Sequence, residues 1–128
     1  MFTPIKSASP GIIALDATGK ITDSDYKTVL IPAIKAAKKD HGKVSILIRF
    51  GPEYDGYTPH AMLDDTMLGI THWNDFNRVA VVTDKSWVRS LVGLQDLAMP
   101  MVDIKAFALA DDDIARLWVK NGNPAATF

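Results

Sequence analysis

The sequence predicts an α/β domain in which a mixed, mostly parallel sheet is flanked by helices and preceded by an antiparallel hairpin. Apolar, strand-like runs alternate with segments of helical periodicity after the first two strands. Strands that alternate with helices of this length are joined by right-handed crossovers and lie parallel. With 128 residues, the chain has the size of one domain with its own core. We expect a single domain over residues 1–128, a sheet of four or five strands, and a loose tail at residues 121–128.

The first third of the chain predicts two strands and one interrupted helix. Residues 2–6 and 11–21 form the hairpin, and the second strand is expected to break near Gly19. A helix follows from Thr22, where Asp25 three residues later completes a capping box, and it ends before a glycine at position 42. Pro32 stands inside this helix, so we expect a kink or a split there.

The remaining segments continue the alternation. The run "KVSILIRF" is apolar over most of its length, which is typical of a central strand covered on both faces. The alternating run "VDIKAFAL" is more typical of an edge strand, and the acidic residues that begin the last helix suit the positive end of its dipole. In order, we expect strand 43–50, helix 59–75, strand 77–84, helix 85–99, strand 102–109 and helix 111–122.

Composition excludes several classes of function. The chain has 14 basic and 15 acidic residues, so it lacks the positive field of a nucleic-acid-binding protein. It has no cysteine, which excludes disulfides, thiolate catalysis and cysteine-based metal sites. No apolar run has the length of a signal peptide core or a spanning helix, so we expect a cytoplasmic protein. We also expect no cofactor.

The order of elements resembles that of a known family. The segments "TGKIT", "KVSILIRF", "NDFNRVAVVTDKSW" and "DIKAFALADDDIARLWV" are similar to the SpoIIAA-like proteins of the STAS superfamily, and the resemblance runs from about residue 10 to residue 119. The strand, acidic turn and tryptophan in "NDFNRVAVVTDKSW" are its most specific part. The resemblance implies a small α/β domain that is a bacterial regulatory or ligand-binding module more often than an enzyme.

The regulatory relatives carry a phosphorylatable serine where the helix after the central strand begins. This chain has "YDGYTPHAM" at that place, with no serine and with Thr58 as the nearest hydroxyl. Thr58 followed by Pro59 is a favoured N-cap and first helical position, so we expect a helix cap and no phosphorylation. The partner-switching mechanism of those relatives is therefore not carried over.

In open α/β folds, ligands bind preferentially at the edge of the sheet formed by the carboxyl ends of the strands. Residues 50–60 reach that edge as an expected loop, with Tyr54 and Tyr57 as a candidate pocket rim. Arg49, helped by Lys85, would present a cation to an anionic group there. Alternatively, Arg49 braces the loop by pairing with Glu53 or Asp84, which is the commoner fate of such charges.

A metal or catalytic site is weakly indicated and is not predicted. His60 and Asp64 share a helix face, and Glu53 or Asp55 would complete a ligand set, but no metal signature accompanies them. An enzyme would use His60 with Asp55 and Arg49, yet no serine or cysteine nucleophile lies beside them.

The expected helix at residues 85–99 has more apolar surface than docking on a sheet requires. Its apolar side chains exceed a stripe of about 100°, and only two of its residues from 86 onwards, Arg89 and Asp96, are charged. The helix is therefore a deeply buried core element, or it covers an apolar cavity, a second subunit or a membrane surface.

Our leading expectation is a non-catalytic domain that binds an apolar or amphipathic small molecule, with peripheral contact to the inner membrane, a homodimer, or a protein-interaction module around Thr58 as alternatives. The expected ligand contacts are Arg49, Tyr54, Tyr57, His60, Trp87, Leu91 and Leu94.

Overall fold

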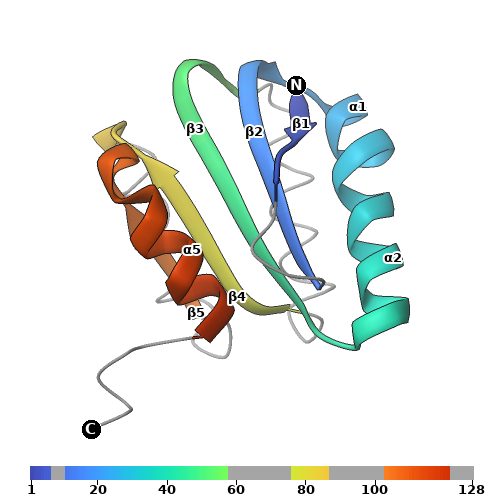
Figure 1. The fold of residues 1–128 in the computed structure, drawn as a ribbon. Helices are drawn as coiled ribbons and strands as arrows, with labels where there is room; N and C mark the ends of the chain where they lie inside the picture. The colour runs from blue at the N-terminus through green and yellow to red at the C-terminus, as the bar shows by residue number, and fades with distance from the viewer. Residues whose placement is uncertain (7–10, 58–75, 87–102, 122–128) are drawn as a thin grey trace, which may run out of the picture.

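Five strands form one mixed sheet in the computed structural model, which describes residues 1–6, 11–57, 76–86 and 103–121 (Figure 1). The strand order is β1-β2-β3-β4-β5, with β1 antiparallel to β2 and the other neighbours parallel. The predicted α/β class and N-terminal hairpin are confirmed. The strands are β1 (Phe2–Pro4), β2 (Ile12–Ile21), β3 (Val44–Tyr57), β4 (Phe76–Thr83) and β5 (Asp103–Phe107).

Helices cover both faces of the sheet, as Figure 1 shows. One face is covered by three consecutive helical elements, α1 (Asp23–Asp25), the π-helical η1 (Tyr26–Leu30) and α2 (Ile31–His41). The other face is covered by α5 (Asp112–Asn121), which follows the short 3-10 helix η3 (Leu109–Asp111). The helices expected at residues 59–75 and 85–99, the Thr58 cap and the tail after residue 121 lie outside the described residues.

Each face of the sheet has its own apolar core. Alternate side chains of the central strands point to opposite faces, and residues 44–47 of β3 are buried on both, as the largely apolar run predicted. The α2 face is packed by Leu15, Ala17, Ile46, Phe50, Tyr54, Val81 and the helical side chains of Tyr26, Leu30 and Ile34. The α5 face is packed by Leu47, Ala80, Val82, Phe107, Ala115, Trp118 and Val119.

Strand β3 is longer than its sequence suggests. We expected a loop after Phe50, but β3 continues to Tyr57 and stays paired with β2 as far as Ile21. The register shifts on both sides of Gly19, which has a φ of 60°, and a bulge there lets Pro52 sit between paired positions where it donates no ladder hydrogen bond. The expected loop and the expected break of β2 near Gly19 are therefore both wrong.

Pro32 splits the first helix, as predicted. The Ile31 N–H donates to the Tyr26 carbonyl, a π-type bond that widens the turn just before the proline. Pro32 then falls in the first positions of α2, where a helix tolerates the missing N–H of proline best. Tyr26 and Leu30 in the widened turn remain buried against β2 and β3.

The predicted capping box at the start of α1 is confirmed. The Thr22 N–H donates to Asp25 Oδ2 (2.8 Å), and the Asp25 N–H donates to Thr22 Oγ1 (3.3 Å). Partial burial works to raise the pKa of Asp25, but the hydrogen bonds from Thr22 and the nearby N-terminal ammonium outweigh it and hold the pKa below its ordinary value. The ionised carboxylate is thus the form that the fold favours.

Replacing Asp25 by alanine should remove this pH-dependent stabilisation. Because the folded pKa is lowered, the contribution is complete above about pH 4, the unfolded value for aspartate, and is lost as the pH falls through the folded pKa. We expect a loss of about 1 kcal/mol in the free energy of unfolding at pH 7, shrinking below pH 4, in urea titrations at several pH values. Ser24→Ala, which alters no charge at the adjacent position, is the control. A loss in the free energy of unfolding for Asp25→Ala that stays constant down to pH 2 would contradict this account.

Candidate functional site

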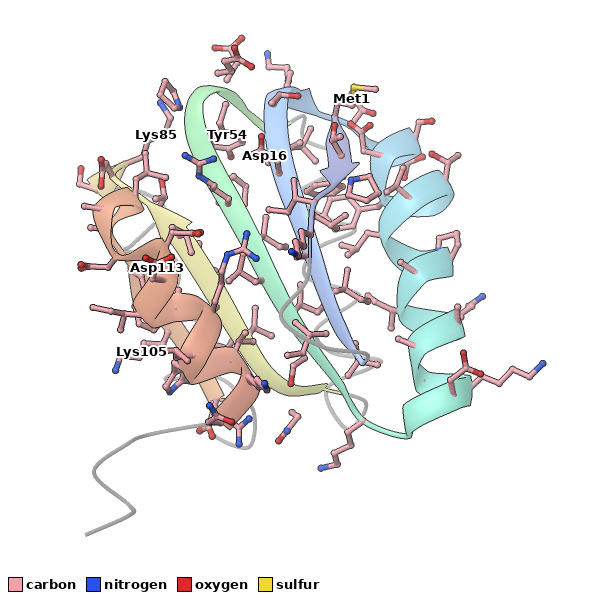
Figure 2. All side chains as sticks on the ribbon, in the orientation of Figure 1. Met1, Asp16, Tyr54, Lys85, Lys105 and Asp113 are labelled. Atoms are coloured by element: carbon pink, nitrogen blue, oxygen red, sulfur yellow. The ribbon has the colours of Figure 1, made fainter. Side chains whose placement is uncertain are left out.

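One row of the sheet, at the level where β4 and β5 end, brings together charged side chains from separate elements. Asp16 of β2 and Arg49 of β3 are in register, and the same row continues through Val82 of β4 to Phe107 of β5. Lys85 follows β4 at this edge. Figure 2 shows Asp16, Tyr54 and Lys85 at this end of the sheet.

Arg49 has a buried nitrogen with no acceptor. Its side chain alternates with Phe50 and shares the α5 face with Leu47. The side chain is half-buried, and Nε is shielded from solvent and makes no hydrogen bond. Among the described residues, Arg49 forms no ion pair with either expected partner, Asp84 or Glu53. The Asp84 carboxylate instead accepts the Leu109 N–H (3.0 Å), and Glu53 is exposed.

Two carboxylates belong to the same region of the α5 face. Asp16 is half-buried beside Arg49 in the strand register. Asp112, the first residue of α5, accepts a hydrogen bond from Arg116 Nε at Oδ2 (2.9 Å), whereas its Oδ1 is buried without a partner. Arg116 also donates from Nη1 to the Lys6 carbonyl (2.6 Å), which fixes this side of the helix over the β1 side of the sheet.

Tyr54 belongs to the core of the opposite face. Its side chain is 4% exposed, and its ring meets that of Phe50 edge-on, with centroids 4.6 Å apart. The Lys85 ammonium lies 6.0 Å from the centroid of the Tyr54 ring, and the Lys85 N–H donates to Thr83 Oγ1 (3.1 Å). Arg49 and Tyr54 therefore flank the edge from opposite faces and do not form one pocket wall.

Comparison with known proteins gives the family. The family model described as SpoIIAA-like matches residues 12–120. The chain belongs to the SpoIIAA-like family. A crystal structure of an uncharacterized protein of the DUF3478 family from Shewanella loihica PV-4, with a SpoIIAA-like fold, is similar to it. The TM-score is 0.73 at 26% identity, covering 93% of this chain and 92% of the other. No curated protein matches the chain.

Several expected contacts of this SpoIIAA-like domain lie outside the described residues. These are the side chain of Tyr57, and all of Thr58, His60, Asp64, Trp87, Leu91 and Leu94. In the part of the chain that the structure describes, no group of three potential metal-ligating side chains occurs. No described helix is both long and apolar enough to span a bilayer.

Sequence reasoning missed the two carboxylates on the α5 face of the SpoIIAA-like domain. Asp16 had a detectable signal, because a charged residue interrupts the apolar run from Ile12 to Ala17 at a position that faces the covered side. Asp112 was interpreted only as a dipole partner of its helix. Its place over the sheet depends on how α5 packs, which no local pattern encodes.

Proposed function

We propose that this SpoIIAA-like domain is a non-catalytic binding module for an amphipathic small molecule whose polar end accepts a hydrogen bond from Arg49. The observation that carries the proposal is the buried Nε of Arg49 without an acceptor. An unmade hydrogen bond of this kind costs about 1–3 kcal/mol, so an acceptor supplied by a ligand gains that amount. Arg49 is in register with Val82, one residue before the end of β4, so it lies near the carboxyl ends of β4 and β5, the end of an α/β sheet at which ligands bind preferentially.

The apolar part of the ligand is suggested by the sequence. The segment from Trp87 to Met99 has more apolar surface than docking on a sheet requires, and an amphipathic molecule would use that excess. In the strands beside Arg49, the described residues on the α5 face are Asp16, Leu47 and Val82, which include no serine, threonine or cysteine. Binding without chemistry is the function that these residues support best.

Ligand-dependent stabilisation tests this function. We expect the protein isolated from its native host without detergent to carry a small amphiphile, visible by native mass spectrometry and solvent extraction. Ten-carbon amphiphiles at a hundred times their Kd should add about 2.7 kcal/mol to the free energy of unfolding, measured as a rise in the thermal midpoint. Protein that is ligand-free when isolated and whose midpoint is unaffected by every amphiphile would refute the proposal.

A further inference from the structure

Among the residues that the structure describes, two buried side-chain polar atoms lack a hydrogen-bond partner, and they are of opposite kinds. Arg49 Nε carries a hydrogen to donate, and Asp112 Oδ1 has lone pairs to accept. Buried polar atoms in folded proteins are nearly always paired, so each unpaired atom calls for an explanation. Here one group that both accepts and donates would satisfy the two atoms together.

The height of Asp112 above the sheet matches that of Arg49. Arg78 Nη1 donates to the carbonyls of Val119 (3.2 Å) and Lys120 (3.3 Å), which fixes the end of α5 near the start of β4. From Arg78 to Val82, the register partner of Arg49, the strand rises about 13 Å. From Val119 back to Asp112 the helix rises about 10.5 Å. Because α5 runs opposite to β4 (Figure 1), Asp112 returns to the level of Arg49.

The side of α5 that carries Asp112 faces toward the β1 side of the sheet. Arg116, one turn further along and bonded to Asp112, reaches the Lys6 carbonyl just beyond β1. On the other side of the helix, Trp118 packs on Phe107 of β5, with ring centroids 5.7 Å apart. Asp112 therefore lies over the part of the sheet that holds Arg49 and Asp16.

The positive charges of Arg49 and Arg116 are matched by the negative charges of Asp16 and Asp112, and the Asp84 carboxylate at the same end of the sheet adds a further negative charge. A ligand carboxylate would accept a hydrogen bond from Arg49, but the Asp16 carboxylate would repel it. It would also leave Asp112 Oδ1 without a hydrogen-bond donor. An uncharged group with both a donor and an acceptor avoids both costs.

We infer that the polar end of the ligand is an uncharged donor and acceptor, such as a glycerol hydroxyl or a primary amide, held between Arg49 Nε and Asp112 Oδ1. The inference rests on the proposed function, because it specifies the polar group of the same ligand. The site selects against free fatty acids and for neutral amphiphiles such as monoacylglycerols or fatty amides.

A series with one chain length tests this selectivity. Isothermal titration calorimetry would compare decanoate, decanamide and 1-monodecanoylglycerol with the full chain at pH 7.5 and low salt. We expect the two neutral compounds to bind at least about tenfold more tightly than decanoate, the loss typical of an unpaired charged group. In Asp112→Ala, and in Asp112→Asn where the shape is kept, this preference should shrink or reverse.

Arg116→Gln is the matched control. It removes the ion pair with Asp112 but leaves Oδ1 in place, so the preference for neutral compounds should persist. Decanoate binding as tightly as the neutral compounds would overturn the inference while leaving the proposed function standing. So would an unchanged order of affinities in both Asp112 variants, with folding verified by circular dichroism. If none of the three compounds binds, the proposed function fails and the inference fails with it.

Discussion

Replacing Trp118 by alanine is expected to lower the free energy of unfolding by about 3–5 kcal/mol, the usual cost of removing a buried tryptophan. Trp118 is 6% exposed and packs against Phe107, in the core that joins α5 to the sheet. Alanine would leave a cavity between α5 and β5 that neighbouring strands cannot fill. Urea denaturation followed by circular dichroism measures the loss.

The adjacent residue provides the control for Trp118. Leu117 is 62% exposed on the outer side of α5, so Leu117→Ala should change the free energy of unfolding by no more than about 0.5 kcal/mol. Similar losses for the two variants would mean that α5 does not pack on the sheet through Trp118. The placement of Asp112 over Arg49 would then lose its basis, since both depend on the same packing.

Arg49→Met should stabilise the ligand-free protein and weaken ligand binding. Methionine keeps an apolar stem of similar length and removes the unpaired Nε–H, whose burial costs about 1–3 kcal/mol. The lost attraction to Asp16 and Asp112 offsets part of this gain, so we expect a net increase of about 1 kcal/mol in the free energy of unfolding. The affinity for whichever of decanoate, decanamide and 1-monodecanoylglycerol binds most tightly should fall by about 10- to 100-fold, because a hydrogen bond from a charged donor is lost.

Opposite signs for stability and binding distinguish a ligand site from a structural brace. If Arg49 were a structural brace, Arg49→Met would lower the free energy of unfolding and leave ligand affinity unchanged. That pair of results would contradict our account of Arg49. Lys85→Met is the control at the same edge, because Lys85 lies on the α2 face beside Tyr54. We expect Lys85→Met to leave the affinity for decanamide within about twofold, since the Lys85 ammonium lies beside the Tyr54 ring on the face opposite to Arg49.

Local patterns in the sequence predicted local structure correctly. The capping box of Thr22 and Asp25 is visible within four residues, and the split at Pro32 follows from one missing N–H. The longer β3 was missed for a related reason. Gly51 and Pro52 are typical of a turn by themselves, and only pairing with β2 beyond Gly19 keeps them in a strand.

The sequence by itself determined the alternation of strands and helices, the family, and the presence of a charged residue in a buried strand. Propensity, periodicity and capping act over a few residues, so these features can be read along the chain. Only the tertiary structure decided which groups surround Arg49. Its expected partners, Glu53 and Asp84, follow the ends of two apolar runs in the sequence, whereas the carboxylates that share its face, Asp16 and Asp112, come from a neighbouring strand and a distant helix. Strand register and helix packing set those neighbours, because both depend on contacts between segments far apart in the chain.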